Sequence, residues 1–203
     1  MVAATTSAIS FASAAADGAA AYVQQKDMAT GHTLSAVLGE RYETIVTELY
    51  RATDTLQSHN RIVVATLDGA IVGHISCIPT HEFAARARAS ARILARSSPR
   101  VRWRLAVTAL RRRLSGNQLG PWAPGQHYIQ SLAVAASARR QGIAAQLIDQ
   151  AIHRARRDDA SALVLNTRAD NTAAMELYAK HGFVIARRRG ANLRLKRPLR
   201  NDA

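Results

Sequence analysis

The chain is poor in the residues that several protein classes require. Cys77 is the one cysteine among 203 residues, so no internal disulfide can form. No Cys/His cluster has the spacing of a zinc site, and we expect no metal. No apolar run approaches the roughly 20 residues that cross a bilayer, so we expect neither a membrane span nor a membrane partner. Apolar residues nevertheless make up 48%, which excludes a wholly disordered chain.

Acidic residues are scarce in the second half of the chain. The net charge is +14, but residues 1–82 carry a net −4 and residues 83–203 a net +18. Between Glu82 and Asp149 there is no acid, and there are 12 arginines. Such a surface attracts anions. Charge alone is compatible with a nucleic acid, a membrane surface, a phosphate-bearing cofactor or a merely solvated basic face.

The N-terminal stretch has low complexity and is rich in Ala and Ser. We expect residues 1–20 to be mobile and residues 21–200 to form a single domain, with an Arg-rich insertion at about 83–126. The first basic residue is Lys26, so we expect no secretory leader. A reducing, cytoplasmic setting fits these features.

Periodicity predicts the elements of the first half. A short strand is expected near residues 21–25. Helical spacing of apolar residues predicts helix over 29–58, broken near Gly39. The Arg-rich segment 83–116 reads as one or two helices broken at 97–99, and a Gly/Pro-rich loop is expected over 116–125.

Two β-branched runs, residues 61–67 and 70–78, flank the dipeptide Asp68-Gly69. This dipeptide is a strong hairpin signal, because both central positions of the tight turn need positive φ. Pro79 then ends the second strand.

Strands and helices alternate in the second half, and a final hairpin is also expected. The helix over 139–156 has the clearest apolar stripe in the chain. The pattern therefore predicts the α/β (α+β) class, with a mixed, largely antiparallel sheet flanked by helices. The expected elements are strands over 128–134, 161–167, 183–188 and 192–196, and helices over 139–156 and 171–181.

The segment 139–144, with sequence RRQGIA, joins a predicted strand to a predicted helix. The first N–H groups of a helix have no internal partner, and the helix dipole adds positive charge at this end. A diphosphate fits such a site. Gly142 lets a ligand approach the backbone, Ala144 is small, and Arg139 and Arg140 add charge. An ordinary helix start is the alternative interpretation.

Residues 128–183 resemble the core of the GNAT superfamily of acetyl-CoA-dependent N-acetyltransferases. The phosphate loop of that family, Q/R-x-x-G-x-G/A, is matched by Arg139, Gly142 and Ala144. Leu132-Ala133-Val134 matches the end of the preceding strand. A later signature is matched by Asn171, Ala174, Leu177-Tyr178 and Gly182-Phe183. Order and spacing agree over about residues 60–200.

The resemblance implies a fold in which the strand ending at Val134 splays away from the strand over 163–167. It implies acetyl-CoA as cosubstrate, with the pantetheine arm against the first strand and the pyrophosphate on segment 139–144. The residues that it assigns to the cofactor are Leu132, Ala133, Val134, Arg139, Arg140, Gln141, Gly142, Ile143, Ala144, Asn171, Ala174 and Tyr178.

The resemblance also implies that Tyr178 is the general acid that protonates the leaving thiolate; packing in the helix face is the alternative. Asn171 would hold the CoA arm or cap its helix. No carboxylate occupies the two splayed strands, and Asn166 stands where some peptide-acetylating relatives carry Glu. Tyr128 and Gln130 share one strand face by alternation and are candidate catalytic residues. Because the two strands carry no carboxylate, we expect water to take the proton of the amine, with Tyr128 in the relay. The other candidate bases are His127, His74 and Glu82.

The function that these expectations describe is transfer of an acetyl group to a primary amine of a small molecule or peptide. Two other classes stay open: a basic protein that binds nucleic acid or the ribosome, and a catalytically silent CoA-binding regulator. Segment 83–114 would be a lid over the acceptor, a nucleic-acid or ribosome contact, or a solvated helix pair. Four apolar residues predict that it packs against something apolar: Trp103, Leu105, Val107 and Leu110. The acceptor's identity stays open, and so does a homodimer.

Overall fold

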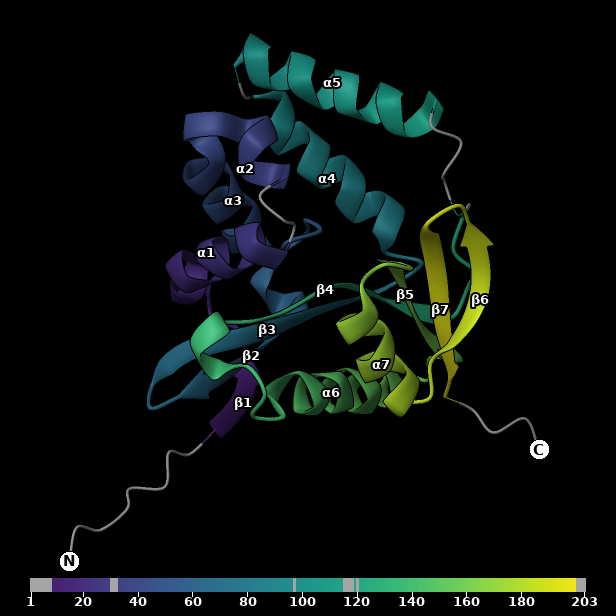
Figure 1. Cartoon of the computed structure of the whole chain (residues 1–203). Coiled ribbons are helices and arrows are strands. Elements are labelled where there is room, and N and C mark those ends of the chain that lie inside the picture. Colours follow the sequence, from purple (N-terminus) through teal and green to yellow (C-terminus); the bar gives the residue numbers. More distant parts are fainter. Residues whose placement is uncertain (1–8, 30–32, 97, 115–118, 120, 200–203) are drawn as a thin grey trace, which may run out of the picture.

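The computed structural model describes residues 9–29, 33–96, 98–114, 119 and 121–199. Within these ranges the chain forms a seven-stranded sheet in the order β1-β2-β3-β4-β5-β7-β6 (Figure 1). Neighbouring strands are antiparallel except β4 and β5, which are parallel. The strands are β1 (Ile9–Ser13), β2 (Ile62–Leu67), β3 (Ala70–Pro79), β4 (Gln126–Val134), β5 (Ala162–Arg168), β6 (Val184–Arg189) and β7 (Asn192–Pro198).

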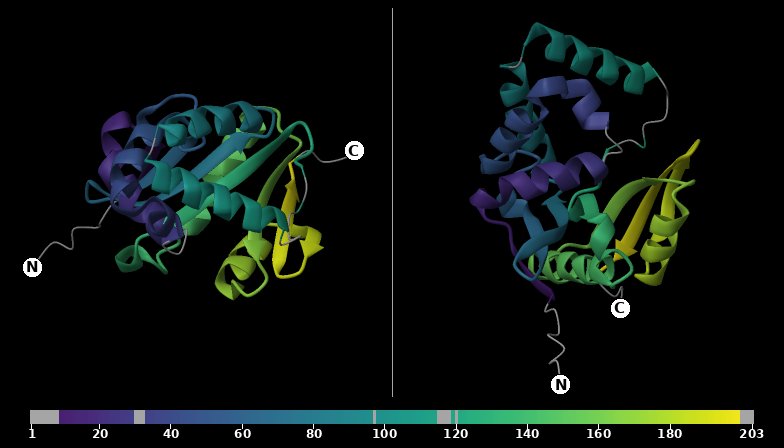
Figure 2. Two further views of the ribbon diagram at one scale, coloured as in Figure 1. Left: turned by 90° about the horizontal axis from the view of Figure 1, so that it is seen from above. Right: turned by 60° about the vertical axis from the view of Figure 1, so that its left-hand side comes forward.

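Helices cover both faces of this sheet. The helices α1 to α5 lie on one side, and α6 lies on the other with α7 packed beside it (Figures 1 and 2). The chain therefore has the mixed α/β architecture that the sequence predicts. The helices are α1 (Ala19–Ala29), α2 (Thr33–Leu38), α3 (Tyr42–Arg51), α4 (Phe83–Ala95), α5 (Pro99–Leu114), α6 (Ile143–Arg157) and α7 (Thr172–Lys180).

The expectation of a mobile segment over residues 1–20 is wrong for residues 9–20. Strand β1 pairs with β2 from Ile9↔Leu67 to Ser13↔Val63, so the folded part starts at or before residue 9. Ile9 and Phe11 alternate with small residues and pack against the core. The Ala/Ser-rich composition hides this short alternation. Residues 1–8 lie outside the described residues.

The expected strand near residues 21–25 is also wrong, because these residues belong to helix α1. Alanine has the highest helix propensity, and four alanines occur between positions 16 and 21 on either side of the helix start. Ala19, Tyr22 and Val23 then follow one another at helical spacing, and all three are buried.

The hairpin prediction is confirmed. Strands β2 and β3 pair up to Leu67↔Ala70, across Asp68 at φ 51° and Gly69 at φ 79°. Strand β3 ends at Pro79, as expected. The helical prediction for 29–58 is confirmed in part, because α2 and α3 are separated by a 3-10 turn at Gly39–Arg41 and α3 stops at Arg51.

Helix α6 begins four residues later than the expected start at 139. Arg140 has φ 63° and Gly142 has φ 76°, and a right-handed helix cannot continue through either conformation. Residues 139–142 therefore form a turn of their own in front of the helix.

Two hydrophobic cores hold the helices to the sheet. The stripe of α6 is buried beneath the sheet with residues of α7 and β7, whereas Tyr22, Val46 and Tyr50 belong to the core under α1 and α3. The buried stripe of α6 is Ile143, Leu147, Ile148, Ala151, Ile152 and Ala155.

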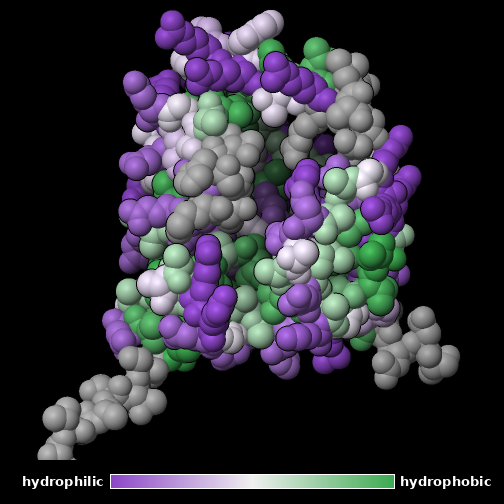
Figure 3. Space-filling model, in the orientation of Figure 1, coloured by the Kyte–Doolittle hydropathy of each residue, from purple (hydrophilic) through white to green (hydrophobic). Residues whose placement is uncertain are grey.

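The Arg-rich segment forms two helices, α4 and α5, and Ser97 between them lies outside the described residues. Val101 is buried and Leu105 packs against the core. By contrast, Trp103 is 70% exposed and Leu110 is 55% exposed, so the expectation that these two pack against something apolar is wrong for the single chain. Strongly hydrophilic side chains cover α5 at the top of Figure 3. Of the expected loop at 116–125, residues 119 and 121–125 are described and belong to no helix or strand, as expected, whereas residues 116–118 and 120 lie outside the described residues.

The parallel strands β4 and β5 are paired along only part of their length. Their pairing runs from Gln126↔Ala162 to Ile129↔Leu165, and both strands continue beyond this point without pairing to each other. On its other edge β4 stays paired with β3 as far as Gly73↔Val134. The sheet is therefore forked, as the resemblance implied.

None of the described helices is long and apolar enough for a bilayer span.

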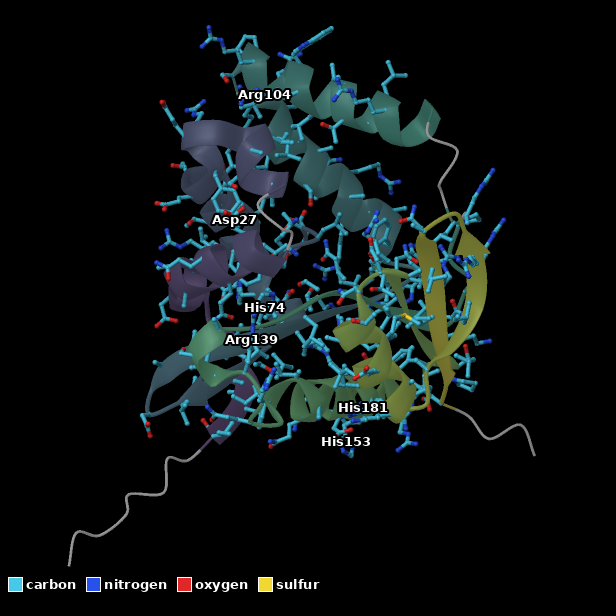
Figure 4. All side chains as sticks on the ribbon, viewed as in Figure 1. Asp27, His74, Arg104, Arg139, His153 and His181 are labelled. Atoms are coloured by element: carbon cyan, nitrogen blue, oxygen red, sulfur yellow. The ribbon has the colours of Figure 1, made fainter. Side chains whose placement is uncertain are left out.

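The buried stripe of α6 provides a test of the fold. Leu147 is fully buried, and its Cδ1 would lie 3.3 Å from a Cβ placed on Gly73 of β3. We expect Leu147→Ala to lower the free energy of unfolding by about 3 kcal/mol, because it leaves a cavity under the sheet. Urea denaturation measures this loss. His153, on the outer side of the same helix (Figure 4), is the control: His153→Ala should change stability by less than about 0.5 kcal/mol.

Candidate functional site

A cavity of about 420 Å³ lies in the fork between β4 and β5. The face shown in Figure 3 is hollowed near the middle of the molecule, with both hydrophobic and hydrophilic residues around the hollow. Helix α1 contributes one residue, Lys26, and the strands and α7 contribute most of the wall. The lining residues are Lys26, Ile129, Gln130, Ser131, Leu132, Ala133, Val134, Arg139, Ala144, Leu165, Asn166, Thr167, Asn171, Ala173, Ala174, Leu177 and Tyr178.

The edge of β4 that faces the gap presents backbone polar groups. The N–H of Ala135 donates to the Val72 carbonyl oxygen at 2.7 Å, so it points towards β3. Along an antiparallel strand the direction of these groups alternates. The amides and carbonyls of Leu132 and Val134 therefore point the other way, into the gap. An extended ligand can pair with such an edge as an added strand would.

A β-bulge marks the point where the strands part. Ser76 pairs with Ser131 and Cys77 with Ile129, which leaves Gln130 as the extra residue of β4. The side-chain oxygen Oε1 of Gln130 is buried and has no hydrogen-bond partner in the structure. A buried polar atom without a partner costs stability, so this oxygen marks a position that a bound molecule can satisfy.

The turn in front of α6 exposes main-chain donors. Gln146 N–H donates to Gly142 O at 3.1 Å and closes the first turn of α6, so the amides of residues 143–145 precede the helical ladder. The left-handed conformations of Arg140 and Gly142 turn the backbone around this point. Arg139 lies beside this turn (Figure 4) and lines the cavity, and its Nε donates to the Val134 carbonyl at 3.4 Å. Donors and cations thus converge where an anion would bind.

Tyr178 lies on α7 and lines the same cavity. Its ring packs edge-on against Phe183, with 5.6 Å between the ring centroids. Burial raises the pKa of the Tyr178 hydroxyl to about 12, with a further contribution from Tyr128. The phenol is therefore protonated at neutral pH and can donate a proton.

Asn171 caps α7, because its side-chain oxygen accepts a hydrogen bond from the Ala174 amide at 3.3 Å. Asn171 and Ala174 also line the cavity. Of the residues expected at the cofactor, Arg140, Gln141, Gly142 and Ile143 do not line the cavity. Ile143 is buried in the core, so at this position only the backbone faces a ligand.

Residues 32–183 match the model of the acetyltransferase (GNAT) family. This match covers most of the chain, including the forked strands, the turn before α6 and Tyr178. The chain belongs to the GNAT acetyltransferase family.

Three proteins illustrate the similarity. N-alpha-acetyltransferase 30 of Saccharomyces cerevisiae is 38% identical over 61 residues, which are 30% of this chain and 35% of that protein. The crystal structure of an N-acetyltransferase from Staphylococcus aureus Mu50 superposes with a TM-score of 0.72 at 15% identity, over 92% of this chain and 99% of the other. The PaiA N-acetyltransferase of Thermoplasma acidophilum, solved in complex with coenzyme A, has a TM-score of 0.56 at 11% identity and covers 94% and 99%. The matched segments span 20% and 35% of the curated relatives' own lengths.

In this GNAT acetyltransferase, the bulge at Gln130 interrupts the regular alternation of β4, on which the expected shared face of Tyr128 and Gln130 depends. Gln130 lines the cavity, whereas Tyr128 stacks on Trp122 with 4.1 Å between ring centroids and packs edge-on against Phe83. The guanidinium of Arg194 lies 4.0 Å from the Trp122 ring centroid. These residues form an aromatic wall.

The three candidate bases of the sequence analysis do not line the cavity. Glu82 is bound in ion pairs with Arg61 and with Arg86, the latter at 2.6 Å. His127 is buried, with its Nε2 3.6 Å from Asp158 Oδ2. Burial lowers the pKa of His127.

His74, the third candidate, is fully buried between α1 and the sheet (Figure 4). Its Nδ1 lies 3.2 Å from Gln25 Oε1 and its Nε2 lies 3.2 Å from Ser131 Oγ. Burial, followed by the positive charge of Lys26, lowers the pKa of His74 to about 3. A histidine with so low a pKa is a poor base.

The sequence analysis did not select Lys26 for the site. The residue belongs to the N-terminal part, where the family resemblance is loose, and an Ala-rich helix offers no motif. One signal was present: Lys26 is the one lysine in the first 179 residues. In the described part of the chain, no group of three or more His, Cys, Asp or Glu side chains is placed to hold a metal ion.

His74 predicts an acid-sensitive fold. Its pKa is about 6.5 in the unfolded chain and about 3 in the fold, where Lys26 and Tyr22 of α1 and Ser131 of β4 surround it. The unfolded state therefore binds the proton more readily, and stability falls as the pH drops below about 6.5 towards 3.

Relative to His74→Gln, the wild type should lose about 2 to 3 kcal/mol of unfolding free energy between about pH 7.5 and 4.5. Urea denaturation at the two pH values measures this difference. Equal losses in the two proteins would contradict a neutral, buried His74.

Proposed function

We propose that this protein transfers the acetyl group of acetyl-CoA to a primary amine by direct attack. The observation that carries the proposal is the convergence of three features on one cavity: the open edge of β4, the donor-rich turn before α6 and the protonated hydroxyl of Tyr178. Membership of the GNAT family supports it, as does the similarity to a GNAT-fold structure solved with coenzyme A.

The residues present fit acetyl-CoA as cosubstrate. The amides of residues 143–145 and the cations of Arg139 and Arg140 would hold the diphosphate, because the site is positive and its donors precede the helical ladder. The backbone of Leu132 and Val134 would bind the pantetheine arm as a strand edge. Ala144 and Ala174 line the cavity with small side chains, which leaves room for the pantetheine arm.

The chain's own groups serve the transfer in two ways. Main-chain N–H groups at the bulge of β4 can polarise the thioester carbonyl, which makes its carbon a better electrophile. The Tyr178 hydroxyl gives its proton to the sulfur as the carbon–sulfur bond breaks, so coenzyme A leaves as a thiol. The new carbon–nitrogen bond forms from the amine lone pair, and the amine gives up one proton to water in the cavity.

The acceptor is a primary amine whose proton is not taken up by a carboxylate of the cavity. Among the described residues that line the cavity there is no Asp, Glu or His. An α-amino group has a pKa near 8 and loses its proton more easily than a lysine side chain with a pKa of about 10.4. Weakly basic amines, such as peptide N-termini, therefore suit this site better than free lysine side chains.

A substitution of Gly142 tests whether the turn before α6 binds the diphosphate. Its φ of 76° strains any other residue, so Gly142→Ala should lower acetyl-CoA affinity about tenfold or more in calorimetric titration. Gly69 is the matched control, because it has φ 79° at the β2–β3 hairpin and an added Cβ there meets nothing within 4 Å. Gly69→Ala should cost similar stability and leave affinity unchanged. Equal affinities in all three proteins would contradict the assignment of the turn.

A substitution of Tyr178 tests its role as the general acid. Tyr178→Phe should slow release of the coenzyme A thiol about 100-fold with little change in acetyl-CoA affinity, because only the proton donor is lost. A thiol-detecting assay with a panel of dipeptides and diamines measures the rate. Tyr128→Phe removes the neighbouring hydroxyl from the aromatic wall and should have the smaller effect. Turnover in Tyr178→Phe at the wild-type rate would reduce Tyr178 to a packing role, and binding without turnover on any amine would indicate a silent CoA-binding protein.

A further inference from the structure

Lys26 is a buried lysine in the wall of the cosubstrate cavity. Its side chain projects from α1, and the residue is 4% exposed. Helix α1 packs across β3 and β4, on the side of the sheet opposite α6. Among the described lining residues, the side chains that titrate are Lys26, Arg139 and Tyr178. The mechanism above uses Tyr178 and Arg139 and leaves Lys26 without a role.

The contacts of His74 locate Lys26 within the cavity. His74 Nε2 lies 3.2 Å from Ser131 Oγ, and the charge of Lys26 acts on the same imidazole. Gln25, the residue before Lys26, reaches His74 from the other side at 3.2 Å. Lys26 and Ser131 therefore both lie near this imidazole, and both line the cavity. Ser131 directly follows Gln130, the bulge residue at which the strands part, and Tyr178 lines the same cavity.

The chemistry of this amine differs from that of a surface lysine. Burial lowers the pKa of the Lys26 ammonium to about 8, and the titratable groups beside it include Tyr22 of its own helix and His74 of β3. A substantial fraction of the side chain is neutral in mildly alkaline solution, and a neutral primary amine is a nucleophile. Such an amine, confined in the same cavity as a thioester, has a high effective concentration relative to it.

We propose that Lys26 is itself an acetyl acceptor, so that the protein acetylates its own cavity lysine from bound acetyl-CoA. This inference rests on the proposed function, because it uses the same site for the acetyl donor. The Nζ lone pair forms the bond to the acetyl carbon, and the carbon–sulfur bond breaks. One Nζ proton passes to cavity water while Tyr178 protonates the sulfur, so the products are N-acetyl-Lys26 and the coenzyme A thiol.

Acetylation changes the cavity in two ways. It removes the positive charge next to His74 and Ser131, and it leaves a larger neutral amide in the space that an acceptor amine would enter. The modified chain therefore transfers acetyl groups to other amines more slowly than the unmodified chain.

The small number of lysines makes the test sharp. The chain contains three: Lys26, Lys180 at the end of α7 and Lys196 in β7, and the last two lie outside the cavity lining. The purified full chain is incubated with acetyl-CoA and analysed by intact mass and peptide mapping. We expect one acetyl group per chain, with Lys26 labelled at least about tenfold faster than Lys180 or Lys196. The same incubation in urea gives the chemical background at each lysine.

Three variants complete the test. Lys26→Arg should lose the added acetyl group, whereas Lys180→Arg and Lys196→Arg should keep it. Tyr178→Phe should slow labelling of Lys26 without changing the background at Lys180. Labelling of Lys26 in the native wild type at or below the level of Lys180 would overturn the inference, and this comparison needs no variant to fold.

Calorimetry with acetyl-CoA separates this inference from the proposed function. If acetyl-CoA binds and external amines are acetylated while Lys26 stays unmodified, the inference alone fails. If acetyl-CoA does not bind to the native chain, the proposed function fails and the inference fails with it.

Discussion

The structure depends on one interruption of strand pairing. Strands β4 and β5 hydrogen-bond to each other as far as Ile129↔Leu165, and then a bulge at Gln130 turns β4 away while β3 keeps its other edge paired. An unpaired strand edge inside a sheet leaves backbone donors and acceptors without partners, which is costly in the absence of a ligand. Side-chain packing fixes both strands in the core beneath α6, because β4 contributes Ile129 and Leu132 and β5 contributes Leu163 and Leu165. The cavity thus results from packing elsewhere in the molecule.

The turn before α6 complements this edge at one end, and Tyr178 complements it at the other. The left-handed conformations of Arg140 and Gly142 direct main-chain donors outward at the open end of the fork. Tyr178, whose phenol remains protonated at neutral pH, lines the same cavity as the bulge residue Gln130. The proposed cosubstrate is a thioester attached to a diphosphate by a long arm, and it would offer a charge, an amide-bearing arm and a sulfur to these features. Lys26 adds an amine to the wall of the same cavity.

Much of the fold follows from local sequence signals, and much of the site follows from a motif. The apolar stripe of α6 and the Asp68-Gly69 turn predicted their elements because short-range periodicity and turn chemistry determine them. The predictions failed where tertiary context decides. Strand β1 is short and lies in a stretch of low complexity, and α1 reads as either helix or strand until Tyr22 and Val23 are seen in a core. The bulge at Gln130 leaves no clear sequence signal, so the interruption of β4 at that residue could not be predicted. The position of Lys26 depends on how α1 crosses β4, which no local pattern encodes.

The most direct test of the central claim is amide hydrogen exchange with and without coenzyme A. The account predicts that the amides of Leu132 and Val134 and those of residues 143–145 exchange quickly in the free protein, since none has a backbone partner in the part of the chain that the structure describes. On addition of coenzyme A these amides should become protected, whereas Ala135, already bonded to Val72, should change little. Protection of the same amides in the free protein, or no change at any of them with saturating coenzyme A, would contradict the forked edge as the binding element.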